Sequence, residues 1–321
     1  MRLTTDKYAI SMEYRISGHE SFPCRYTWLP KIVRNLAKNP SLFSEEDNAM
    51  VVLGVGKNMV RSMRFWAQAS GVITSVRGVY TLTKLGISVL GANGCDPFLE
   101  DIRTLWLLHW NLSTAQESPL LAWDFLLNRW QEPEFTPNTA LVALRKEVDR
   151  SSDKPLSPAT LEQHFETFLH TYVPTRGRKG EVQEDNLDCP LVELELIKKI
   201  GERESSQNLG RREPIYAFRR EEKPEITSGL FLFCLNDFWS KRHGAEQTLS
   251  LRHVAYGEGS PGQVFKLPEE DIRARLDSLK ERTEGDYSYE ESANLQKLRR
   301  KSEGNTDQLL REIYASEAAY V

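Results

Sequence analysis

The chain has 321 residues, of which 40% are hydrophobic and 27% are charged. This is enough apolar sequence for a full core and for roughly two or three domains. It contains 42 Lys and Arg residues and 46 Asp and Glu residues, which gives a formal net charge of -4 at pH 7. That balance excludes a histone-like polycation, so any contact with nucleic acid must be confined to a local surface.

Cysteine spacing and hydropathy exclude further classes of protein. The four cysteines lie far apart with no Cys-x-x-Cys pair, which argues against a structural zinc site and against a disulfide framework. The first twenty residues lack a continuous apolar segment, and the longest apolar run, Leu230 to Leu235, is too short to cross a bilayer. We therefore expect a cytoplasmic protein with reduced thiols and no membrane contact.

The first predicted helix covers residues 27–37, where apolar residues recur at helical spacing. The acid pair Glu45-Glu46 then favours the start of a second helix. From Asn48 to Cys95 the chain has the order of a winged helix-turn-helix. A short apolar helix to about residue 53 is followed by the turn Gly54-Val55-Gly56 and by another helix that opens at Lys57.

The segment from Asn48 to Cys95 contains no Asp or Glu, although it carries five cations. On the helix that opens at Lys57, polar residues recur at +4, +3 and +4 on one face, and apolar residues cover the other. We expect the polar face and its neighbours to contact double-stranded DNA through Lys57, Asn58, Arg61, Arg64, Gln68, Arg77 and Lys84. The alternative is a winged-helix fold used only for protein contacts, in which these cations form a solvated face.

A two-stranded wing is predicted next, from residues 72–76 and 79–82, with Arg77-Gly78 as the turn and Arg77 at its tip. Thr83 is the expected N-cap of a short helix that ends near Leu90. After a linker at residues 91–97, an aromatic-rich helical region extends to about Val173. Its aromatic residues indicate a packed helical core, and a base-stacking platform is the less favoured alternative because stacking residues need exposed strands or loops.

A basic, glycine-rich loop at residues 175–180 is followed at once by an acidic run. Cations beside clustered carboxylates are typical of a metal-assisted phosphodiester site, in which Mg²⁺ or Mn²⁺ is held by the acids. The catalytic candidates are Glu184, Asp185 and Asp188, with Asp185 and Asp188 as metal ligands; Arg176, Arg178 and Lys179 supply positive charge to DNA. The alternative is a surface loop with internal charge compensation. His19 and Glu20 form a second acid–base candidate.

The C-terminal third is predicted to be an α+β module with a strand at residues 215–218 and helices at 229–239, 249–255 and 269–279. A second winged-helix-like unit fits this order, and the tail after Tyr287 is expected to be helical and charged. Neither glycine-rich loop, at residues 54–57 or 257–263, has the Walker A pattern, so the sequence does not support ATP binding. The fold class is therefore mainly α with small β wings, divided into residues 12–95, 96–175 and 176–321.

Four segments together resemble the bacterial domain-of-unknown-function family 4007. They are GHESF (18–22) with RYTWLPK (25–31), LGVGKNMV (53–60), EDNLDCPLVEL (184–194) and VAYGEGSPGQVF (254–265). Members of that family are encoded beside genes for a cysteine desulfurase, a phosphoadenosine-phosphosulfate-reductase-like protein and an ATPase, in clusters that place sulfur in the DNA backbone. The resemblance implies a part in DNA phosphorothioation and phage defence, most closely that of the DNA-nicking B component of the Ssp-type system.

Two hypotheses follow. The chain is either a metal-dependent nicking endonuclease or a non-catalytic DNA-binding subunit, or gene regulator, that recruits the sulfur-transfer proteins. A homodimer is compatible with both, because winged-helix proteins often pair on DNA.

Overall fold

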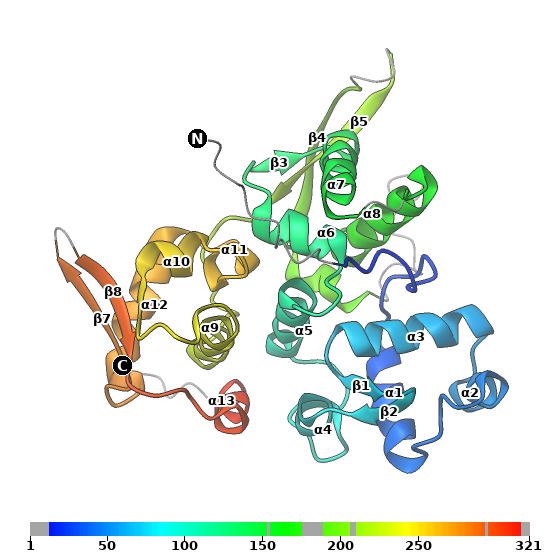
Figure 1. Cartoon of the computed structure of the whole chain (residues 1–321), viewed down its shortest axis with the longest axis horizontal. Helices are drawn as coiled ribbons and strands as arrows, with labels where there is room; N and C mark the ends of the chain where they lie inside the picture. Colours follow the sequence, from blue (N-terminus) through cyan, green and yellow to red (C-terminus); the bar gives the residue numbers. More distant parts are fainter. Residues whose placement is uncertain (1–12, 153–154, 175–188, 206–209, 293–294, 316–321) are drawn as a thin grey trace, which may run out of the picture.

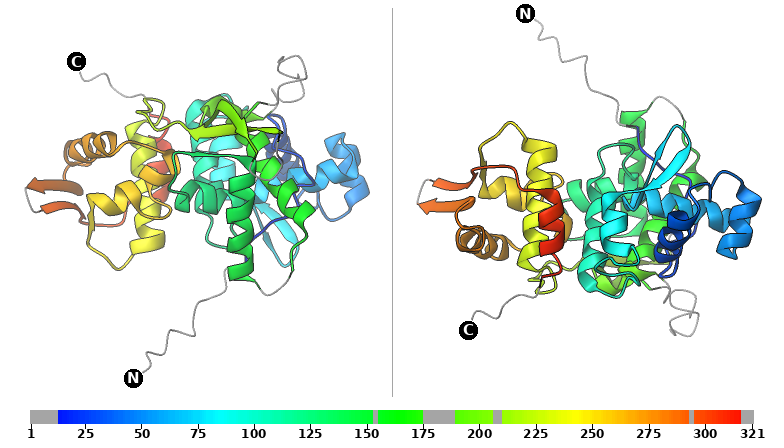
Figure 2. Two further views of the ribbon diagram at one scale, coloured as in Figure 1. Left: turned by 90° about the horizontal axis from the view of Figure 1, so that it is seen from above. Right: turned by 90° about the horizontal axis from the view of Figure 1, so that it is seen from below.

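The computed structural model describes residues 13–152, 155–174, 189–205, 210–292 and 295–315. The fold is mainly helical with small antiparallel sheets, as the sequence predicted. Figure 1 shows a central group of helices between an N-terminal unit and a C-terminal unit, and the two views of Figure 2 agree. One hydrophobic cluster, from Cys24 to Ile313, runs through all three regions. Within the described ranges, no helix is long and apolar enough to span a membrane.

The N-terminal unit has the predicted helices and hairpin at nearly the predicted positions. Local signals fix them: Gly54, at a φ of 62°, ends the second helix, and the Thr83 side chain accepts a hydrogen bond from the Gly86 N–H at 3.0 Å. Arg77 and Gly78 take left-handed φ values of 51° and 81° at the hairpin turn. The elements are α1 (Trp28–Lys38), α2 (Glu46–Leu53), α3 (Lys57–Ala69), β1 (Ile73–Val76), β2 (Val79–Leu82) and α4 (Lys84–Leu90).

The aromatic residues of the central region pack as a core. This confirms the predicted packed helical core and not the alternative of a base-stacking platform. Trp106, Trp110 and Trp123 are fully buried. The elements are α5 (Ile102–Thr114), α6 (Leu121–Asp124), η1 (Phe125–Arg129), β3 (Glu134–Phe135), α7 (Pro137–Ser151), α8 (Pro158–Tyr172), η3 (Pro190–Leu194), β4 (Ile197–Glu204) and β5 (Arg212–Phe218). The sheet has the order β3-β5-β4, so strand pairing crosses the domain boundary expected between residues 175 and 176.

Helix α6 continues directly into η1, a single π-helical turn. The Trp130 N–H donates to the Phe125 carbonyl at 2.9 Å, which is the i to i+5 bond of a π-helix. This wider turn places Asp124 and Arg129 on the same side of the helix. The fully buried Nζ of Lys266 donates to the Leu127 carbonyl at 2.6 Å and so satisfies a backbone acceptor within the turn.

The C-terminal unit contains a three-stranded antiparallel sheet in the order β6-β8-β7. Its elements are α9 (Ser228–His243), β6 (Thr248–Ser250), α10 (Leu251–Tyr256), α11 (Pro261–Phe265), α12 (Glu269–Arg282), β7 (Tyr287–Ser292), β8 (Leu295–Arg300) and α13 (Thr306–Glu312). The prediction of a helical tail after Tyr287 was wrong for β7 and β8, whereas α13 at Thr306–Glu312 is helical as predicted. Tyr287 pairs opposite Arg300 in a β-hairpin, since this strand pairing lets Tyr287 and Leu298 bury their side chains in the core.

Candidate functional site

Helix α3 is amphipathic in the predicted sense. Val60, Met63, Trp66 and Ala67 are buried on one side. On the other side Lys57 and Asn58 are exposed at the start of the helix, and Arg61, Arg64 and Gln68 are half-buried. Gln68 also lines a hollow of about 410 Å³ together with Tyr14 and Arg15.

We refer to Lys57, Arg61 and Arg64 as the α3 cations. Two of them form ion pairs with a carboxylate of α2. Glu46, at the start of α2, receives Lys57 Nζ at 2.8 Å and Arg61 Nε at 2.6 Å. Hydrogen bonds from Arg61 and then Lys57 lower the pKa of Glu46 to about 2. The predicted cationic face is therefore partly neutralised by a carboxylate that lies just before the acid-free segment of the sequence.

The other cations predicted to contact DNA each have different neighbours. The Arg64 guanidinium lies over the Tyr80 ring at 5.4 Å from its centroid. Arg77 is exposed at the tip of the β1–β2 hairpin, as predicted. Lys84 forms an exposed ion pair at 3.0 Å with Asp307 of α13. This pair is a contact with the C-terminal unit that nothing in the local sequence indicated.

His19 is buried, with 3% of its surface exposed, and its Nε2 lies 3.3 Å from His164 Nδ1. Its carbonyl accepts a hydrogen bond from Ser62 of α3 at 2.9 Å. Burial lowers the pKa of His19 to about 4 and that of His164 to about 3, so both rings are neutral near pH 7. Glu20 is half-buried in a left-handed conformation with a φ of 50°. These positions favour a packing role for His19 over an acid–base role.

The predicted phosphodiester site lies outside the described residues. This applies to Arg176, Arg178, Lys179, Glu184, Asp185 and Asp188. The loop is bounded by the end of α8 at Tyr172 and by Cys189, which precedes η3. Its catalytic and metal-binding roles stay predictions.

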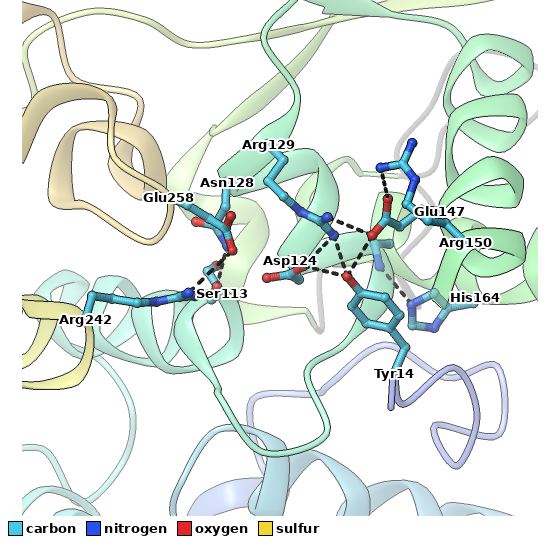
Figure 3. Close-up of polar contacts among 11 residues, drawn as sticks. Tyr14, Ser113, Asp124, Asn128, Arg129, Glu147, Arg150, His164, Arg242 and Glu258 are labelled. Atoms are coloured by element: carbon cyan, nitrogen blue, oxygen red, sulfur yellow. Dashed lines mark hydrogen bonds and ion pairs between the residues drawn. The ribbon is translucent and has the colours of Figure 1, made fainter. Parts of the chain in front are cut away.

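A buried ionic network that the sequence did not reveal joins the segment before α1 to α6, η1 and α7 (Figure 3). Arg129 of η1 donates to Asp124 Oδ2 and to Glu147 Oε1 of α7, each at 2.7 Å, and also to the Tyr14 hydroxyl. Asp124 and Glu147 are only 3% and 6% exposed. Burial raises the pKa of Asp124, whereas the charge of Arg129 opposes that rise.

Next to this network lies a group of oxygen atoms from two units of the fold. Asn128, 3% exposed, donates through Nδ2 to the Ser113 carbonyl at 2.7 Å, and its Oδ1 has no hydrogen-bond partner in the described part of the chain. Glu258 comes from the loop between α10 and α11, and its charge raises the pKa of Asp124 further. Figure 3 shows Asp124 between the Arg129–Glu147 pair and the side chains of Asn128 and Glu258.

Glycines fix the loop that carries Glu258. A Cβ on Gly262 would lie 2.2 Å from the Ala255 carbonyl oxygen, and Gly259 has a φ of 75°. Ser260 then caps α11 by accepting from the Gln263 N–H at 3.3 Å. The sequence singled out this loop for its glycines alone, and the carboxylate that they position was missed.

The chemistry of this oxygen group fits a hard divalent cation, because carboxylate and amide oxygens are its preferred protein ligands. Throughout the described ranges, no group of three or more His, Cys, Asp or Glu side chains is arranged to hold a metal ion. A site here therefore depends on the unpartnered amide oxygen of Asn128 beside the two carboxylates.

One segment connects the buried network with α3. Tyr14 contributes its hydroxyl to the network, while the next residue, Arg15, stacks its guanidinium 4.1 Å from the centroid of the Phe65 ring on α3. The Arg15 N–H donates to the Pro119 carbonyl at 2.9 Å, just before α6. The cationic helix and the buried network are thus held by the same short stretch of backbone.

Comparison with solved structures shows two close likenesses. A magnesium ion-bound SspB crystal structure matches with a TM-score of 0.80 and 26% identity, covering 96% of this chain and 89% of that chain. A second SspB crystal structure matches with a TM-score of 0.76 and 25% identity, covering 92% of this chain and 85% of that chain. The comparison with curated protein sequences gives no match. The sequence profile described as "Protein of unknown function (DUF4007)" matches residues 16–314, and the chain belongs to this family.

Proposed function

We propose that this protein is the DNA-binding and DNA-nicking component of a bacterial phosphorothioation system. The observation that carries the proposal is the likeness to SspB, which extends over 96% of the chain. In this role it works beside a cysteine desulfurase, a phosphoadenosine-phosphosulfate-reductase-like protein and an ATPase. A nick would open one strand so that the modifying proteins reach the phosphate.

The N-terminal unit is the proposed contact with double-stranded DNA, acting as a winged helix. Lys57 and Asn58 are exposed at the N-terminus of α3, where the helix dipole adds to the attraction for phosphate. Arg77 at the hairpin tip is positioned as a wing contact. The segment from Asn48 to Cys95, which contains no Asp or Glu, supports the assignment, and Glu46 of α2 partly neutralises its charge.

Strand cleavage requires an activated nucleophile and positive charge near the scissile phosphate. We retain Glu184, Asp185 and Asp188 as the proposed general-base and metal groups, with the loop cations as electrostatic partners. The likeness to a magnesium ion-bound structure supports Mg²⁺ or Mn²⁺ as the cofactor. A bound divalent ion would neutralise phosphate charge and lower the pKa of its bound water.

The direct test is incubation of supercoiled plasmid with pure protein and Mg²⁺ or Mn²⁺. Conversion to the open circle supports nicking, whereas plasmid that stays supercoiled while still binding the protein supports a non-catalytic DNA-binding subunit or regulator. The Asp185→Asn change removes a charge at nearly constant volume. It should abolish nicking and leave DNA binding and the melting temperature unchanged, and Glu181→Gln in the same acidic run is the matched control.

A further inference from the structure

We propose that Asp124, Asn128 and Glu258 form a divalent-cation site between the central region and the C-terminal unit. The cation would be hard and oxygen-liganded, such as Mg²⁺ or Mn²⁺. This site is separate from the metal groups proposed at residues 184–188. The inference therefore goes beyond the proposed nicking function, and its test is independent of nicking.

The orientation of the Asn128 amide is the first argument. Its Nδ2 is committed to the Ser113 carbonyl at 2.7 Å, so the opposite end of the amide must be the oxygen. That oxygen is buried and has no hydrogen-bond donor among the described residues. A buried acceptor without a partner costs about 1–3 kcal/mol, and a cation is one group that would remove this cost.

The second argument is the arrangement of carboxylates. Asp124 uses Oδ2 for both Arg129 and Tyr14, and Oδ1 receives no hydrogen bond from the described residues. Helix α11, which follows the loop of Glu258, packs against η1, which carries Asn128. Glu258 is exposed, and its ion pair with Arg242 is long, at 3.5 Å. Figure 3 draws Asp124 and Glu258 near Asn128, with Arg129 on the far side of Asp124 and Arg242 on the far side of Glu258.

A cation at this site would connect two parts of the fold. Asp124 and Asn128 are on adjacent turns of α6 and η1, whereas Glu258 belongs to the α10–α11 loop of the C-terminal unit. A shared cation would hold that loop against the central helices. Binding should therefore raise the melting temperature, because a ligand that binds only the folded state stabilises it.

The first experiment is a titration of the full chain, stripped with EDTA, with Mn²⁺ followed by electron paramagnetic resonance. We expect a Mn²⁺ site that Mg²⁺ displaces and a melting temperature that rises with either ion. Glu258→Gln should weaken Mn²⁺ binding at least about tenfold, because it removes one of two charged ligands. The matched control is Glu221→Gln, which breaks another arginine pair at 3.2 Å on the surface and should bind like the parent.

A second variant separates this site from the loop at residues 175–188. The double change Asp185→Asn and Asp188→Asn should retain the Mn²⁺ site. Three results would overturn the proposal. They are loss of the Mn²⁺ site in that double variant, equal Mn²⁺ binding by Glu258→Gln and Glu221→Gln, and a parent protein without displaceable Mn²⁺. A cation bound as described in a protein that never nicks plasmid would refute the proposed function and leave the site standing.

Discussion

Replacing Arg129 by Met should be strongly destabilising, because it leaves two buried carboxylates without their shared partner. Arg129 donates at 2.7 Å to both Asp124 and Glu147, which are 3% and 6% exposed. Breaking a buried pair from one side costs about 3–5 kcal/mol. At roughly 2 °C per kcal/mol for a chain of this size, the melting temperature should fall by about 6–10 °C.

The loss should also depend on pH. Burial raises the pKa of Asp124 and Arg129 opposes that rise, so its removal raises the pKa further. The folded variant then keeps a proton that the unfolded chain releases above about pH 4, and its stability falls as the pH increases. The stability that the variant loses relative to the parent should therefore be larger at pH 8 than at pH 5.

Differential scanning calorimetry at both pH values measures this difference. Arg150→Met is the matched control, because Arg150 is exposed and its ion pair with Glu147 is longer, at 3.3 Å, with an expected cost of about 0–1 kcal/mol. If Arg129→Met and Arg150→Met melt at the same temperature, or if the stability that Arg129→Met loses is independent of pH, the reasoning about buried charge fails.

Three further outcomes are expected. Changing the three α3 cations to Ala should weaken duplex binding and reduce the slope of log affinity against log salt by roughly 0.9 for each lost phosphate contact, as fluorescence anisotropy would show; an unchanged slope would remove α3 from the DNA contact. Glu46→Gln should have the opposite effect and tighten duplex binding severalfold at low salt, since it releases Lys57 and Arg61; weaker binding would contradict this. The parent should lose stability as the pH falls from about 6.5 toward 4, because the unfolded chain protonates His19 and His164 before the folded chain does. The change His164→Gln should flatten that decline in a thermal-melt series, and an equally steep decline would show that other groups cause it.

The sequence by itself determined the local elements of the N-terminal unit. A helix that opens at Lys57, a turn at Arg77-Gly78 and an N-cap at Thr83 each depend on signals within a few residues, such as apolar period, glycine and side-chain capping. The same local reasoning failed after Tyr287, where charged residues suggested a helix. There, pairing of β8 with its neighbour β7 and with the distant β6, together with burial of Leu298, decided the structure.

Only the tertiary structure decided which charges meet. Glu46 reaches Lys57 and Arg61 because α2 packs against α3, and Tyr14 reaches Asp124 across 110 positions of the chain. Periodicity carries no information about such pairs, because it describes the faces of single elements and not their neighbours in space. The grouping of Asp124, Asn128 and Glu258 has the same origin, because the π-helical turn packs against α11, which follows the glycine-shaped loop that carries the exposed Glu258.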